Sequence, residues 1–149
     1  MRRSPLLAVV VLVVTSCGAV MASELESHPE AHLRYPGSSV VSVIHTDEST
    51  SSDSLGGPQM VEAARAGAFL DAHASIDQIH TWYERWLVAH GWHPVAGAIT
   101  DYERGDREVY SIGAGGEMLR DHDPTATAYY AYYSVTPQDC HPHQIACWR

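Results

Sequence analysis

Histidine is the residue type in this sequence that offers the most chemistry. The chain carries ten histidines in 149 residues, and imidazole can ligate Zn or Cu and titrates near neutral pH. His141 and His143 are the candidates for a metal site, because they lie close together between two cysteines. Neither their spacing nor that of His90 and His93 or Asp121-His122-Asp123 matches an established metal motif. We therefore expect surface histidines without metal or cofactor, and metal binding by His141 and His143 is the alternative.

No catalytic motif can be assigned. Residues 113–116 (GAGG) have the glycines of a phosphate-binding loop, but they lack the lysine and Ser/Thr that such a loop requires, so we interpret them as a hairpin turn. Carboxylates such as Asp101 and Glu103 lie in predicted turns, where solvated acids are expected. We expect a protein that is not an enzyme. A hydrolase is the less favoured alternative, and it would need a buried polar cluster in a cleft.

A targeting segment precedes Cys17. Two arginines near the start are followed by an apolar run over residues 6–14, which is far shorter than the about 20 residues that span a bilayer. The next four residues, Val14-Thr15-Ser16-Cys17, resemble the bacterial lipobox, in which the cysteine is diacylated and becomes the first residue of the mature protein. We expect residues 1–16 to be a signal peptide and Cys17 to be lipidated on the extracytoplasmic face of the membrane. A secretory signal that is cleaved nearby, for example after Ala22, is the alternative.

Residues 17–33 are polar and acidic and show no strand pattern. We expect a solvated tether between the lipid and a single domain at 34–149. A metal or acid site at Glu24, Glu26 and Glu30 is the alternative. The formal net charge is −9, and removal of the signal peptide, with two arginines and no acid, makes it −11. This balance, with no basic cluster, argues against nucleic-acid binding.

Cys140 and Cys147 remain once Cys17 is assigned to lipid. An even pair in an exported protein predicts a disulfide, which here would close a small loop in the tail. Trp148 is expected to pack back on the domain.

The strongest pattern in the chain predicts a helix at about 75–90. Ser75 and Gln78 have the spacing of a capping box, and Gly91 can end the helix. One stripe carries apolar residues at spacings of three and four: Ile76, Ile79, Trp82, Tyr83, Trp86 and Leu87. A stripe of this size must be buried on another element, which we expect to be a sheet.

Strands are predicted on both sides of this helix, at 38–45, 67–74, 107–114 and 125–136, with a short one within 92–102. Residues 59–65 fit a short helix or a strand lead-in, and a continuous helix over 59–74 is an alternative. Residues 46–58 are expected to be a disordered hairpin tip or a functional loop. The predicted fold is α+β, with an antiparallel sheet of four to five strands and the helix on one face.

The strand at 125–136 is rich in tyrosine. Period-two alternation places Tyr129 and Tyr133 on one face, and Tyr130 and Tyr132 on the other. Tyrosine suits a strand with one packed face and one wet face. Tyr130 and Tyr132 are therefore the candidates for interaction with a partner.

Two further features carry a resemblance: the turn Tyr35-Pro36-Gly37 before a predicted strand, and the segment Trp82-Tyr83-x-x-Trp86-Leu87 followed by Gly91-Trp92. Together with the lipobox they resemble a loose group of small actinobacterial lipoproteins and secreted domains of unknown function. The resemblance implies an envelope location and adds no catalytic residues. We expect a lipid-anchored, non-enzymatic module of the cell envelope that binds an envelope protein or a cell-wall component. A histidine-based metal-binding lipoprotein is the alternative.

Overall fold

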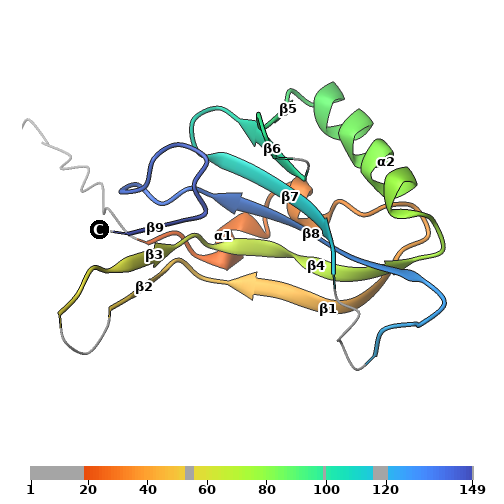
Figure 1. Cartoon of the computed structure of the whole chain (residues 1–149), viewed down its shortest axis with the longest axis horizontal. Coiled ribbons are helices and arrows are strands. Elements are labelled where there is room, and N and C mark those ends of the chain that lie inside the picture. The colour runs from red at the N-terminus through yellow and green to blue at the C-terminus, as the bar shows by residue number, and fades with distance from the viewer. Residues whose placement is uncertain (1–18, 53–55, 99, 116–120, 149) are drawn as a thin grey trace, which may run out of the picture.

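The computed structural model describes residues 19–52, 56–98, 100–115 and 121–148. A six-stranded antiparallel sheet, sheet A, forms the body of the domain in the order β1-β4-β8-β7-β6-β5 (Figure 1). A three-stranded sheet, sheet B, has the order β2-β3-β9. The strands of sheet A are β1 (Ser39–Thr46), β4 (Arg65–Ala72), β8 (Thr127–Val135), β7 (Glu108–Ala114), β6 (Asp101–Arg104) and β5 (His93–Pro94). Those of sheet B are β2 (Ser49–Ser51), β3 (Met60–Glu62) and β9 (Ala146–Trp148).

Helix α2 (Ile76–Ala89) packs on one face of sheet A, which we call the helix face. The capping box is present: the Gln78 backbone N–H donates to Ser75 Oγ at 3.3 Å, and the Ser75 N–H donates to Gln78 Oε1 at 2.9 Å. Three of the six stripe residues, Ile79, Tyr83 and Leu87, are fully buried, and the other three are only partly buried. The α+β class and an antiparallel sheet under one main helix are therefore confirmed.

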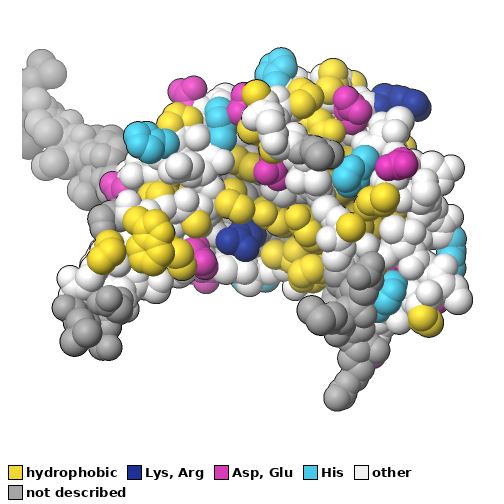
Figure 2. All heavy atoms as spheres, in the orientation of Figure 1, with side chains coloured by type: hydrophobic (Ala, Val, Ile, Leu, Met, Phe, Trp, Pro, Cys, Tyr) yellow, Lys and Arg dark blue, Asp and Glu magenta, His cyan; other side chains and the backbone are white. Residues whose placement is uncertain are grey.

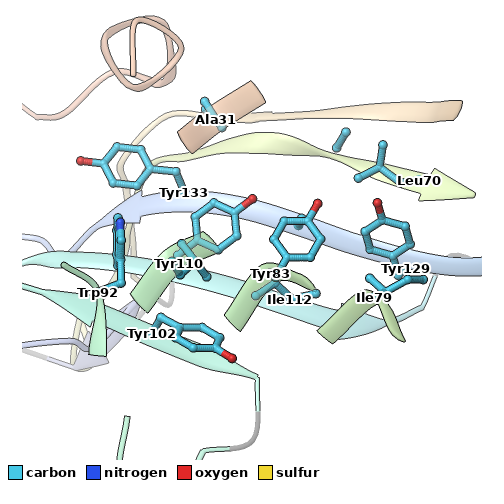
Figure 3. Packing of buried hydrophobic residues seen from close by; sticks show 14 of the residues in the cluster. Ala31, Leu70, Ile79, Tyr83, Trp92, Tyr102, Tyr110, Ile112, Tyr129 and Tyr133 are labelled. Atoms are coloured by element: carbon cyan, nitrogen blue, oxygen red, sulfur yellow. The ribbon is translucent and has the colours of Figure 1, made fainter. Parts of the chain in front are cut away.

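Buried tyrosines link α2, β7 and β8. Figure 3 shows Tyr83, Tyr110 and Tyr129 side by side between the helix and the sheet. Their hydroxyls need partners when the rings are buried. Tyr83 donates to the Leu33 carbonyl at 3.0 Å, and the Tyr129 hydroxyl lies 2.7 Å from Ser38 Oγ. Segment 33–38 is thus held by the core, and burial raises the pKa of Tyr83 and Tyr110, which keeps both phenols neutral.

Residues 19–33 are a packed part of the domain, in place of the solvated tether that the sequence predicts. They form α1 (Ala22–Leu25) and the 3₁₀ helix η1 (Pro29–His32), which cover part of the helix face that α2 leaves open. Leu25 and Ala31 join the core, and Glu30 is only 4% exposed. The physical reason is area: one 14-residue helix cannot cover six strands, so the few apolar residues of segment 19–33, which have no helical periodicity, complete the layer.

The strand count exceeds the predicted four to five. The stretch expected to hold one short strand folds back as the hairpin of β5 and β6, and β6 extends to Arg104, where a turn was predicted. The loop expected at 46–58 contains β2, and the ambiguous stretch at 59–65 contains β3. None of the helices in the described part of the chain is long and apolar enough to cross a membrane.

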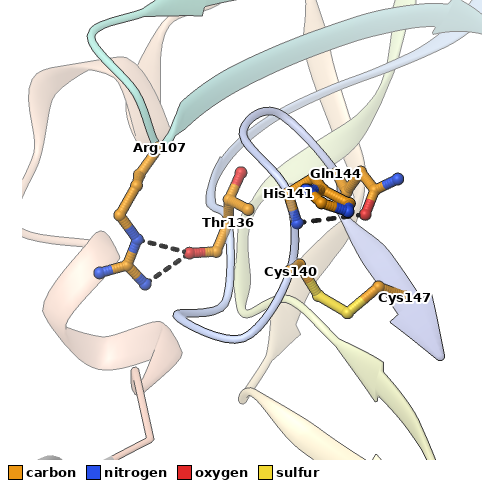
Figure 4. The surroundings of a disulfide bond; sticks show 6 residues. All are labelled: Arg107, Thr136, Cys140, His141, Gln144 and Cys147. Carbon is orange, nitrogen blue, oxygen red and sulfur yellow. Dashed lines mark hydrogen bonds between the residues drawn. A yellow bond between two sulfur atoms is a disulfide. The ribbon is translucent and has the colours of Figure 1, made fainter. Parts of the chain in front are cut away.

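The predicted disulfide between Cys140 and Cys147 is present, with Cα atoms 5.6 Å apart (Figure 4). Next to it, Arg107 Nε donates to the Thr136 carbonyl at 2.8 Å, which ties the start of the tail to β7. The tail then adds β9 to β3. Contrary to the prediction, Trp148 does not pack back on the domain. It lies on the outward side of sheet B and is 68% exposed, because Cys147, not Trp148, is paired with the buried Val61.

Candidate functional site

The face of sheet A opposite α2, which we call the open face, carries the two candidate tyrosines. Tyr130 and Tyr132 alternate with the core residues Tyr129 and Tyr133 along β8, as the period-two pattern predicts. Their rings stack, with centroids 5.7 Å apart and an interplanar angle of 23°. The open face is not uniformly exposed to solvent, since Tyr132 is only 9% exposed. The structure therefore places these two rings together as a partly buried aromatic surface.

Two glycines on neighbouring strands shape this surface. Gly113 of β7 is paired with Tyr130, and a Cβ at Gly113 would lie 2.3 Å from the Tyr130 hydroxyl oxygen. The Tyr130 ring can thus lie down across β7 only because residue 113 has no side chain. Gly67 of β4 is paired with Tyr132, and its Cβ would lie 2.2 Å from the Ala131 carbonyl oxygen. Sequence reasoning missed both glycines, because their importance depends on strand register.

Arg65 places a positive charge on the tyrosine pair. Its guanidinium carbon lies 5.7 Å from the centroid of the Tyr132 ring, within reach of a cation–π interaction. Its Nε is buried and has no hydrogen-bond partner in the described part of the chain. Among the described residues no carboxylate forms an ion pair with Arg65, whereas Arg104 is paired with both Glu30 and Glu108. Arg65 is therefore a partly buried cation without a carboxylate partner among the described residues, in an acidic protein.

These residues line a shallow groove with a volume of about 510 Å³. Its walls are formed by Ile44, Thr46, Arg65, Phe69, Gly115, Tyr130 and Tyr132. Figure 2 shows hydrophobic side chains gathered over β4 and β8 around a basic side chain. Phe69 meets Tyr130 edge-on, with centroids 6.3 Å apart. A concave, mostly apolar site with a few polar groups is the usual form of a small-molecule site, and this volume lies in the usual range.

The polar edge of the groove is formed around Tyr130. Burial raises the pKa of the Tyr130 phenol, and the nearby Tyr132 and Asp101 raise it further, so Tyr130 is a neutral hydrogen-bond donor at physiological pH. Asp101 itself accepts a hydrogen bond from Ser111 Oγ at 2.6 Å. The groove therefore offers flat aromatic walls, one cation and phenolic donors, which suit a ring-shaped ligand that carries an anionic group.

The candidate metal residues do not converge. His143 Nδ1 lies 2.7 Å from Glu103 Oε2, and its Nε2 lies 2.9 Å from the Gly105 carbonyl oxygen, so both ring nitrogens are engaged. His141 uses its backbone N–H to contact Gln144 Oε1 at 3.3 Å. No group of three or more His, Cys, Asp or Glu residues is arranged to hold a metal ion within the described ranges. The geometry makes His143 a clamp between the tail and the β6–β7 turn.

A second polar cluster lies at the end of β4. Asp71 is buried and accepts hydrogen bonds from His122 Nδ1 at 2.6 Å and from the Asp123 backbone N–H at 2.7 Å. Asp123 in turn accepts from the Thr125 N–H, and this contact lowers its pKa. The cluster fastens the turn before β8 to β4, and we assign it a structural role.

The remaining predicted site residue, Cys17, lies outside the described residues. No family model matches the chain, and neither a curated protein nor a solved structure is significantly similar to it. The resemblance to small actinobacterial lipoproteins therefore stays a prediction.

Proposed function

We propose that this protein is a non-enzymatic binding module, held at the extracytoplasmic face of the membrane by lipid on Cys17, whose open-face groove binds an anionic saccharide of the cell wall. The observation that carries the proposal is Arg65, a cation without a carboxylate partner among the described residues, set beside stacked aromatic rings.

The ligand class follows from the two kinds of surface in the groove. Tyr130, Tyr132 and Phe69 present ring faces and edges, on which the apolar C–H face of a sugar packs well. The guanidinium of Arg65 suits a carboxylate or phosphate, because a charge-assisted, forked hydrogen bond is stronger than a neutral one. Anionic sugars of the wall combine both features and are present outside the membrane, where a lipidated protein would meet them.

Binding can be tested with three sugars that share one ring and differ in charge. N-acetylmuramic acid carries a carboxylate, N-acetylglucosamine 1-phosphate carries a phosphate, and N-acetylglucosamine is neutral. We expect isothermal titration of the full-length protein in detergent to detect the two charged sugars at least about tenfold more tightly, since a hydrogen bond to a charged group is worth roughly 1.5–3 kcal/mol. A difference between the two charged sugars would identify the preferred anion.

Arg65→Gln should remove this preference and leave the weak binding of the neutral sugar. The matched control is Arg85→Gln, which removes an exposed arginine on α2 and should change nothing. Equal affinity for all three sugars, no binding of any of them, or full preference in Arg65→Gln would refute the ligand assignment.

The anchor is tested separately. Cys17→Ser should move the protein from the membrane fraction to the soluble fraction, and mass spectrometry of the wild-type protein should detect a diacylated N-terminal cysteine. An unchanged membrane fraction in Cys17→Ser would contradict lipidation without affecting the groove.

A further inference from the structure

The packed N-terminal segment determines how far the domain can stand from its lipid. Val20 is fastened to Glu48 through both of its backbone groups: its N–H donates to Glu48 Oε2 at 3.4 Å, and its carbonyl accepts from the Glu48 N–H at 3.0 Å. The Ala22 N–H, two residues further on, donates to Asp47 Oδ1 at 2.8 Å. Three residue steps separate Val20 from Cys17, and they span at most about 11 Å. A lipid on Cys17 would therefore hold the domain against the bilayer, where a free segment of 16 residues would have let it move away.

The attachment point also selects which end of the domain meets the bilayer. Glu48 directly precedes β2, and β2 is joined through β3 to β9, so the described chain begins beside sheet B (Figure 1). Two strand spacings put β9 about 10 Å from β2, and Trp148 lies two residues beyond the row that contains Ser49, about 7 Å further along. These lengths are comparable to the headgroup layer of a membrane, which is roughly 5–8 Å thick on each side.

Sheet B presents the right chemistry for a lipid surface. Met60 and Trp148 form a cross-strand pair on its outward side, and Trp148 is 68% exposed. Met21, next to the attachment point, is 44% exposed. Figure 2 shows hydrophobic side chains gathered over β3 and β9 at the end of the molecule where the described chain begins. An exposed tryptophan is costly in water and is enriched at membrane interfaces, where its ring is half-buried and its N–H stays hydrated.

We infer that sheet B is a membrane-contacting surface and that the Trp148 indole inserts into the lipid headgroup layer beside the acylated cysteine. This inference rests on the lipid anchor of the proposed function. The attraction is apolar and centred on Met60 and Trp148, because Glu62 on the same side of sheet B and Asp47 and Glu48 beside it are acidic and give no attraction to anionic lipid.

The experiment uses the full-length lipidated protein in phosphatidylcholine vesicles that contain dibrominated phosphatidylcholine, whose bromines quench nearby tryptophans. Flotation on a density gradient is measured first. Wild-type protein should float, and its tryptophan fluorescence should fall relative to vesicles without bromine. Trp148→Phe should float equally and lose most of the quenching, and far-UV circular dichroism checks that it is folded.

Trp82→Phe is the matched control, because Trp82 is a partly exposed tryptophan on α2, far from sheet B in Figure 1. This variant should keep the quenching. If Trp148→Phe is quenched as strongly as wild type, or if the floating wild-type protein is not quenched, the membrane contact is refuted while the anchor stands. Failure of wild-type protein to float refutes the anchor and, with it, this inference.

Discussion

The ion pair between Glu30 and Arg104 supports the sharpest stability prediction. Glu30 Oε1 lies 2.7 Å from Arg104 Nη1, and the Glu30 side chain is only 4% exposed. Arg104 also donates two hydrogen bonds to Glu108, and its guanidinium carbon lies 4.5 Å from the centroid of the Trp92 ring. Arg104→Met keeps most of the packing of the side chain and leaves Glu30 buried without a counter-charge.

The expected cost follows from the burial of the two partners. Removal of one member of a buried ion pair costs roughly 3–5 kcal/mol. The Arg104 side chain is 31% exposed, so solvent screens part of the stranded charge and we expect about 3 kcal/mol. For a domain of this size that corresponds to a Tm decrease of about 10 °C.

The double variant separates the charge effect from lost packing. Glu30→Gln in the Arg104→Met background removes the stranded charge, so it should recover about 2 kcal/mol of the loss. Both Arg104→Met proteins lack the contact with Trp92, and this term cancels in the double-mutant cycle. Urea unfolding followed by tyrosine and tryptophan fluorescence measures all four proteins. Additivity of the two single substitutions to within about 0.5 kcal/mol would refute the coupling.

Loss of this ion pair would also change how the domain is held at the membrane, because the pair fastens segment 19–33 to the sheet. Loss of the Glu30–Arg104 contact should loosen segment 19–33 before the sheet unfolds, since this segment contributes few core residues. Limited proteolysis of Arg104→Met should cut within 19–33 faster than in wild type, and Arg85→Met is the control.

Two further predictions concern the groove and the first turn of the packed segment. Gly113→Ala should displace the Tyr130 ring and weaken binding of the charged sugars at least about tenfold, because the added Cβ would lie 2.3 Å from the phenol oxygen. Gly115→Ala adds a Cβ at an ordinary contact distance of 3.4 Å from the same ring, at the groove wall, so it should weaken binding much less; equal binding by both variants would contradict the role of Gly113. His45 Nδ1 donates a hydrogen bond to Glu26 Oε1, and this bond raises the pKa of His45 above its usual value near 6.5. The contribution of the His45–Glu26 hydrogen bond to the stability of the folded protein is therefore fully present below pH 6.5, and it is lost as the pH rises through the folded-state pKa of His45. An NMR titration should find this raised pKa of His45 in wild type and a lower pKa in Glu26→Gln; the same pKa in both would refute the assignment.

Elements whose signals lie within a few neighbouring residues could be predicted directly from the sequence. The helix from Ser75 to Ala89 combines a capping box, a 3.6-residue stripe and a terminal glycine, and each of these acts within one or two turns. The alternation along β8 likewise depends only on the period of a strand, so the faces of Tyr130 and Tyr133 were predictable. The pairing of Cys140 with Cys147 followed from parity, because only these two cysteines remain once Cys17 is assigned to lipid in an exported protein.

Other features depend on contacts between distant parts of the chain, for which the sequence contains no local signal. Segment 19–33 looks like a solvated linker because its few apolar residues have no period, and its burial depends on how much of the sheet α2 leaves uncovered. The extra strands β2, β5 and β9 are only two or three residues long, so an alternation of polar and apolar residues cannot be detected in their sequences. They form because a neighbouring strand offers backbone hydrogen bonds.

The candidate site belongs to this second group. Arg65, Gly113 and Tyr130 come from three different strands, and only the register of sheet A brings them together. Composition and local pattern were sufficient for the α+β class, the main helix and the tyrosine faces, because those are set within a few residues. The groove, the buried charge of Glu30 and the exposure of Trp148 were decided by long-range pairing, because burial and charge compensation are properties of neighbours in space.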